Sequence, residues 1–149
     1  MGLRFSRIAE LAYGWRCFRP LVRKYIKLVE GGALHSTTLR SILRNRFGVE
    51  VGMYSYGECL HPGCLPSGTI IGRFCSLGPG IMVFRRNHPS DRVALHPFFY
   101  NSQTGYVAED TIQSNRDNPL YIGNDVWIGA RTIILPGCKN IGNGAVIGA

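Results

Sequence analysis

Two histidines lie in a segment of the sequence that combines aromatic residues with carboxylates. His88 and His96 are each followed by proline, and both fall between residues 84 and 119. An imidazole can gain or lose a proton near neutral pH, so a histidine in such a segment is a candidate general acid or base. The segment is longer than the ~12–15 residues beyond which connections in compact domains are usually functional or disordered. Its phenylalanines and tyrosines argue against disorder, and we therefore expect it to carry acid–base chemistry.

Short repeats of six residues stand on both sides of this segment. Ile122, Ile128 and Ile134 are six residues apart, and Ile141 and Ile147 are six apart again. A helix would show a period near 3.6, and a half-buried strand would alternate strictly. A period of six is instead typical of a solenoid whose short strands turn a corner at every sixth residue.

Each repeat has a physical requirement that the sequence meets. Val51 and Ile71 are large inward residues followed by glycine, and a small residue stands four positions later. Two inward side chains of one strand share a narrow interior, so one of them has to be small. This pattern predicts that Cys75 and Cys138 are buried and act as small hydrophobic residues.

Before the repeats, the sequence indicates three helices. Residues 3–19 carry apolar side chains at helical spacing, namely Leu3, Ile8, Leu11, Trp15 and Phe18. Pro20 can open a second helix over about residues 20–30, which Gly31 and Gly32 would stop. Ser36 or Thr37 can cap a third short helix, with Gly48 at its end.

These helices carry all of the excess positive charge. The net charge is +8, and residues 1–47 hold ten Lys and Arg against Glu10 and Glu30. A basic amphipathic segment can lie on an anionic membrane surface. It can equally cap one end of the solenoid with its arginines in solvent, and the two roles are compatible. No nucleic-acid-binding motif accompanies the charge, so we expect no nucleic-acid partner.

Length and composition fit one cytosolic unit of 149 residues, of which 45% are hydrophobic. No apolar run approaches the ~20 residues of a membrane-spanning helix, and the N-terminus lacks the apolar block of a secretory signal. Five scattered cysteines then predict reduced thiols. Cys59 and Cys64 flank His61 in CLHPGC, but the Pro-Gly pair there predicts a turn and no second ligand pair exists. We expect no metal, and we divide the chain into a basic helical segment (1–48) and a β domain (49–149).

The repeats, the NHPSDRVALHPFF loop and the run IGNDVWIGARTIILPGCKNIGNGAVIGA together resemble the hexapeptide-repeat acyltransferases. The nearest branch is the xenobiotic and type-B chloramphenicol acetyltransferase group, which includes polysaccharide O-acetyltransferases. The resemblance covers about residues 49–149. It implies a mainly β fold, a left-handed parallel β-helix with the loop 84–119 inserted, which assembles as a homotrimer with acetyl-CoA bound between subunits.

The resemblance also implies roles for single residues. His88 would be the general base that takes a proton from an acceptor hydroxyl. Residues near the acceptor would be Asn87, His96, Tyr100 and Trp127. Residues along the pantetheine arm of acetyl-CoA would be Gly129, Ala130, Gly148 and Ala149.

The function implied is transfer of an acetyl group to a sugar hydroxyl of a surface polysaccharide or its precursor. The enzyme would work in the cytoplasm or at the inner face of the membrane. Two alternatives stay open: a xenobiotic (antibiotic) acetyltransferase, and a non-catalytic β-helix scaffold. Relatives usually continue beyond the position of Ala149 with at least another coil, a lysine-bearing segment and a C-terminal tail. We therefore expect either a C-terminally truncated chain or fragment, or another element that covers this end.

Overall fold

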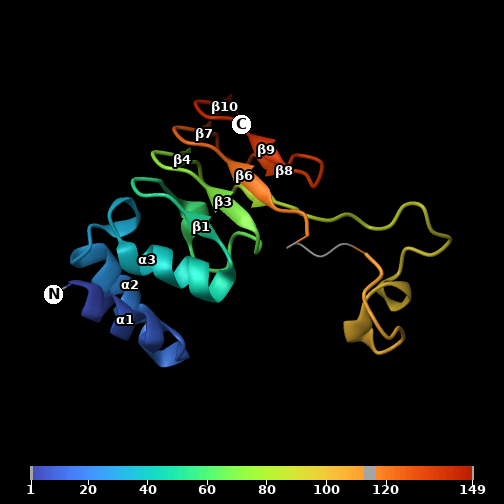
Figure 1. Ribbon diagram of the computed structural model, residues 1–149, viewed down its shortest axis with the longest axis horizontal. Helices are drawn as coiled ribbons and strands as arrows, with labels where there is room; N and C mark the ends of the chain where they lie inside the picture. Colours follow the sequence, from blue (N-terminus) through green and yellow to red (C-terminus); the bar gives the residue numbers. More distant parts are fainter. Residues whose placement is uncertain (1, 113–116, 149) are drawn as a thin grey trace.

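The computed structural model describes residues 2–112 and 117–148, with side chains from Ser6 onward. Its N-terminal part is helical and its remainder is built from very short strands (Figure 1). The helical elements run in the order α1 (Gly2–Tyr13), η1 (Arg16–Phe18), α2 (Arg19–Leu28), η2 (Gly32–Leu34), α3 (Thr37–Ile42) and η3 (Leu43–Phe47).

The predicted ends of the third helix are confirmed. The Ser36 side chain accepts a hydrogen bond from the backbone N–H of Leu39 at 2.9 Å, which satisfies one of the free donors of the first turn. The helix continues as the π turn η3 and stops at Gly48, whose φ of 66° is left-handed and suits glycine.

The first helix is shorter than the predicted range 3–19, and its apolar side chains lie largely in solvent. It ends at Tyr13, and the predicted apolar residues Ile8, Leu11 and Trp15 are 62%, 70% and 69% exposed. The reason is a polar contact with α3 and η3: the Glu10 carboxylate accepts hydrogen bonds from Ser41 of α3 and from Asn45 of η3. These bonds turn the face with Glu10 and Tyr13 inward, and the more apolar face therefore remains in solvent.

The strands form three sheets in which every pair is parallel. The first sheet has the order β1 (Glu50–Val51), β3 (Thr69–Ile71), β6 (Leu120–Ile122) and β9 (Asn140–Ile141). The second has the order β2 (Tyr56–Gly57), β4 (Ser76–Leu77), β7 (Trp127–Ile128) and β10 (Val146–Ile147). The third pairs β5 (Met82–Val83) with β8 (Ile133–Ile134). The chain visits the sheets in turn, a path compatible with a parallel β-helix. In the first coil, the 3-10 turn η4 (Glu58–Leu60) stands where later coils have a strand of the third sheet.

The predicted inward positions are confirmed by register and burial. Ile71 pairs with Ile122, and Leu77 pairs with Ile128, and all four side chains are at most 5% exposed. The small inward places are also buried, among them Ser55, Cys75 and Val126. The prediction that Cys138 is buried is confirmed only in part: Cys138, like Val51, packs against the core but is partly exposed.

Close stacking of the coils explains the glycines that follow Val51 and Ile71. A Cβ added at Gly72 would lie 2.5 Å from the carbonyl oxygen of Gly123 in the next coil. One added at Gly52 would lie 2.5 Å from the carbonyl carbon of Gly72. No side chain fits at either corner without separating the coils.

Figure 1 shows how these parts are arranged: α3 lies between the strands and the pair α1–α2, which forms the outermost layer. Residues 84–112 and 117–119, here called the arm, leave the coils after β5, extend away from them and rejoin them at β6. Within the described part of the chain, the helices are too short or too polar to cross a bilayer.

Candidate active site

The arm is fixed to the coils by a buried arginine that the sequence did not single out. Arg85 is 3% exposed, and its Nε donates to the carbonyl oxygen of Asn118 at 2.8 Å. Its Nη1 donates to the carbonyl oxygen of Cys138 at 2.8 Å, and its Nη2 donates to that of Pro119 at 3.1 Å. The Asn118 amide returns a bond to the carbonyl oxygen of Arg85 at 2.8 Å. Burial lowers the pKa of Arg85. The two ends of the arm are therefore joined to each other and to the coil below.

The bonds of Arg85 and Asn118 form what is here called the stem of the arm. Beyond this stem, the arm has its own internal contacts. It contains two 3-10 turns, η5 (Pro97–Phe99) and η6 (Ser102–Thr104). The Asp110 carboxylate accepts bonds from the backbone N–H and the hydroxyl of Ser102, at 2.7 and 2.8 Å, and these bonds lower the pKa of Asp110. The rings of Phe98 and Tyr106 pack with their centroids 4.2 Å apart. The arm thus presents its side chains from a folded support.

His88 is oriented by two groups of the arm. Its Nδ1 lies 3.2 Å from the carbonyl oxygen of Leu95 and 3.0 Å from the hydroxyl oxygen of Tyr100. A carbonyl oxygen only accepts hydrogen bonds, so its approach favours the tautomer in which Nδ1 carries the proton. In that tautomer Nε2 keeps its lone pair, and no residue of the described ranges hydrogen-bonds to it. The arrangement can present a neutral imidazole that accepts a proton at Nε2.

A hollow of about 380 Å³ adjoins this imidazole. It brings together three of the residues selected from the sequence, which are Asn87, His88 and Tyr100. Tyr100 is 5% exposed, so it contributes its hydroxyl next to the histidine and little free surface. The hollow also includes Arg86, which the sequence did not single out because it stands in no motif. The other lining residues are Phe84 and Ile112.

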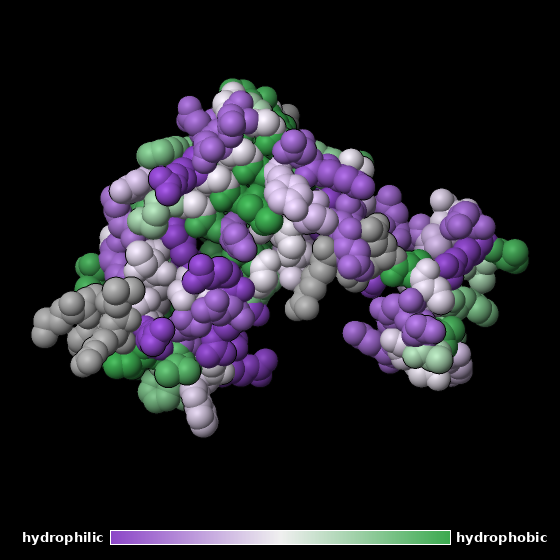
Figure 2. Space-filling model, viewed as in Figure 1, coloured by the Kyte–Doolittle hydropathy of each residue, from purple (hydrophilic) through white to green (hydrophobic). Residues whose placement is uncertain are grey.

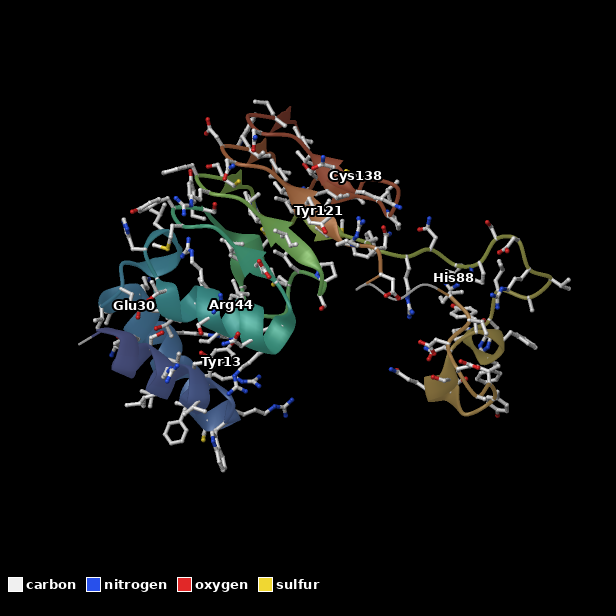
Figure 3. The ribbon with its side chains drawn as sticks, viewed as in Figure 1. Tyr13, Glu30, Arg44, His88, Tyr121 and Cys138 are labelled. Carbon is white, nitrogen blue, oxygen red and sulfur yellow. The ribbon has the colours of Figure 1, made fainter. Side chains whose placement is uncertain are left out.

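Two other residues selected from the sequence lie outside this hollow. The Nδ1 of His96 accepts a bond from the backbone N–H of Phe98, and its ring packs on the Phe98 ring, so it closes the turn at η5. Trp127 is half exposed on the outer side of β7. Figure 3 shows His88 on the arm, well away from Tyr121 and Cys138 of the coils. One chain therefore does not bring His88 and Trp127 together.

The small residues selected for the cofactor stand at one corner of the coils. Gly129 and Gly148 follow paired strands, and the Thr132 hydroxyl bonds to the carbonyl oxygens of both, at 2.9 and 3.0 Å. A Cβ added at Gly148 would meet nothing within 4 Å, so this edge is open. Ala130 lies against Gly78 of the coil before it. Ala149 lies outside the described residues.

The cysteines give little support for a metal site. In residues 2–112 and 117–148, no three His, Cys, Asp or Glu side chains are grouped as a metal site would require. In CLHPGC, Cys59 is buried and Cys64 is exposed. Burial raises the pKa of the Cys59 thiol to about 11, which disfavours the thiolate that a metal would bind.

A larger cleft, of about 510 Å³, lies between α3 and the first coils. Arg40 lines it, but its guanidinium is already bonded to the carbonyl oxygens of Ala33, Ser36 and Gly52 at 2.8 to 2.9 Å. These bonds join the helical segment to the coils. We assign this cleft a structural role and place the candidate site at His88.

Comparison with known proteins points to one group. The chain is similar to the chloramphenicol acetyltransferases of Escherichia coli and Morganella morganii, 38% and 39% identical over 118 residues. Each match covers 68% of this chain and 56% of the relative. It is also 36% identical over 83 residues to a probable macrolide acetyltransferase of Lysinibacillus sphaericus, a match covering 54% of this chain and 46% of that protein. The chain therefore spans about half the length of the curated relatives it matches. No family model and no solved structure matches it.

Proposed function

We propose that this chain acts as an acetyl-CoA-dependent O-acetyltransferase, because it is a relative of the chloramphenicol and macrolide acetyltransferases. The repeats and the loop predicted this relationship. The observation that carries the proposal is the orientation of His88, whose Nδ1 faces the Leu95 carbonyl oxygen while no residue of the described ranges hydrogen-bonds to Nε2. The acetylated product would be an ester of a hydroxyl on the acceptor.

In the proposed reaction, Nε2 of His88 removes the proton of the acceptor hydroxyl as that oxygen attacks the thioester carbonyl. Acetyl-CoA supplies the activated acyl group. The Leu95 carbonyl oxygen keeps the proton on Nδ1 and then stabilises the imidazolium that forms. Tyr100 holds the ring from its edge, with centroids 6.2 Å apart. Asn87 and Arg86 line the hollow beside it and would contact the acceptor or the thioester.

The proposed site needs two chains. His88 is on the arm, whereas the corner that holds Gly129, Ala130 and the open position Gly148 is on the coils (Figure 1). In a homotrimer the arm of one chain would reach the coil edge and Trp127 of its neighbour. This arrangement agrees with a left-handed β-helix over residues 49–149 and a separate basic helical segment over 1–48, which we propose as the domain division. We also propose a cytoplasmic location.

The relatives favour an antibiotic hydroxyl as the acceptor. The names of those described above refer to chloramphenicol and to a macrolide, and none of these names refers to a polysaccharide. The sugar acceptor that the family resemblance implied is therefore without support among them. We propose the antibiotic as substrate and keep the sugar as a comparison.

The experiment is an acetyl-transfer assay with labelled acetyl-CoA and three acceptors: chloramphenicol, a macrolide and an acetyl-free oligosaccharide. Product is identified by mass spectrometry, which avoids interference from the exposed thiols Cys17 and Cys64. We expect an acetyl ester of one of the antibiotics. Binding of acetyl-CoA without transfer to any of the three would contradict the proposed acceptor class. Absence of both binding and transfer would favour the non-catalytic scaffold.

A further inference from the structure

The outermost helices expose an unusual number of large apolar side chains. They lie in α1, the turn η1 and α2 or directly beside them, and they are between 46% and 70% exposed. We call this set the helical outer face: Ile8, Leu11, Trp15, Phe18, Leu21, Leu28 and Val29. Single apolar residues are normal on a protein surface, but seven large ones exposed on consecutive helical elements favour a contact site. Figure 2 shows hydrophobic residues along the edge of the molecule formed by these helices.

The same helices carry exposed positive charge, while their two carboxylates point elsewhere. Glu10 bonds to Ser41 and Asn45 of the neighbouring helical layer. Glu30 accepts bonds from the hydroxyls of Ser36 and Thr38. The exposed cationic side chains between these glutamates and beside them are Arg7, Arg16, Arg23, Lys24 and Lys27.

We propose that the helical outer face binds the surface of an anionic phospholipid bilayer. Its aliphatic side chains and Phe18 would enter the boundary between headgroups and acyl chains, and Trp15 would lie at the interface that tryptophan prefers. The lysines and arginines would contact the anionic headgroups.

Charge favours an anionic bilayer over a second copy of the chain as the partner of this face. Two copies joined through this face would bring two cationic surfaces together, which disfavours the contact. An anionic bilayer complements the charge and accepts the apolar side chains at the same time. The arm with His88 extends from another side of the molecule (Figure 1), so the docked protein would keep its candidate site in water.

The test is binding of the full chain to phospholipid vesicles. We expect flotation with vesicles of phosphatidylcholine containing phosphatidylglycerol, and little flotation with phosphatidylcholine alone. The chain has two tryptophans, so a Trp127→Phe variant reports on Trp15 only. Its emission should shift to the blue when anionic vesicles are added, and brominated lipids should quench it.

Two pairs of substitutions separate the contribution of the positive charges from that of the apolar side chains. Lys24→Gln with Lys27→Gln should weaken binding roughly fivefold for each charge removed. Leu11→Glu with Phe18→Glu should abolish the blue shift of Trp15. Val93→Glu, at a fully exposed apolar position of the arm, is the matched control and should bind like the wild type. All the changed side chains are exposed, so the fold should persist in both Glu-substituted proteins. Circular dichroism checks this.

Three results would overturn the proposal: no binding to anionic vesicles, binding that Leu11→Glu with Phe18→Glu leaves unchanged, or self-association that the same pair abolishes. The last result would assign the face to a second copy. None of these measurements depends on acetyl transfer, so the proposal can fail while the proposed function stands.

Discussion

At the scale of single residues, the orientation of His88 is the main finding. The sequence indicated this histidine and left its orienting group open. The structure supplies that group as the backbone carbonyl of Leu95, with the Tyr100 hydroxyl beside it. A backbone acceptor is invisible to sequence motifs, because any residue can provide it.

This geometry leads to a prediction for Tyr100→Phe. The variant loses one bond to Nδ1, while the Leu95 carbonyl still selects the same tautomer. We expect kcat to fall about two- to tenfold, the equivalent of one ordinary hydrogen bond, with KM for acetyl-CoA little changed. Steady-state kinetics with the acceptor at saturation measure this. A loss of activity as complete as that of removing His88 would contradict the secondary role of Tyr100.

At the scale of elements, Arg85 determines how the arm leaves the coils. In Arg85→Met the carbonyl oxygens of Asn118, Pro119 and Cys138 would lose their shared donor while remaining buried. We expect the free energy of unfolding to fall by about 2–4 kcal/mol, measured by urea denaturation. Arg86→Met, at the exposed neighbouring position, is the control and should change it by less than about 0.5 kcal/mol. Equal effects of the two variants would show that the stem does not depend on this guanidinium.

The contact between α1 and α3 should respond to pH through Glu10. Hydrogen bonds from Ser41 and then from Asn45 lower its pKa below the ordinary value of 4.5. The ionised carboxylate therefore stabilises the fold fully above about pH 4.5, and this contribution is lost as the pH falls through the lower pKa of the folded state.

We expect stability between pH 5 and 3 to fall less steeply in Glu10→Gln than in the wild type, and Ser41→Ala to reduce the slope in the same direction. Urea denaturation at a series of pH values measures both. An unchanged slope in both variants would show that Glu10 is not coupled to folding.

The sequence predicted the coils and the third helix better than the first helix. The period of six identified the inward residues of the coils, since steric demand repeats at every corner, and the cap at Ser36 has a local signature. The spacing placed Ile8 and Leu11 on one face of a helix but did not show whether that face is buried, and both residues are exposed. The contact of Glu10 with Ser41 and Asn45 spans more than thirty positions, and local pattern carries no information about it.

At the scale of the whole molecule, the candidate site is divided between the arm and the coils. Sequence similarity could suggest the residues on each side, but only the structure shows that they lie apart in one chain. The stem bonds of Arg85 join segments more than thirty residues apart, and the aromatic contacts of the arm likewise lack a periodic pattern.

Co-assembly of two inactive variants tests this division. His88→Ala removes the base of the arm, and Gly148→Trp fills the open coil edge without meeting a neighbour within 4 Å at its Cβ. If each site combines the arm of one chain with the edge of the next, random mixing of the two should restore about a quarter of the sites. The mixture is unfolded and refolded together, and acetyl transfer is compared with each variant alone. No recovery in a mixture shown to co-assemble would place the site within one chain.

The most direct test of the account compares His88→Ala with His96→Ala in acetyl transfer to the best acceptor. Both residues are exposed histidines of the arm followed by proline, but only His88 lines the hollow. The account predicts that His88→Ala lowers kcat by about 10²–10⁴-fold, the usual contribution of a general base, while His96→Ala keeps kcat within a few fold of the wild type. A His88→Ala enzyme that still transfers acetyl at the wild-type rate would contradict it.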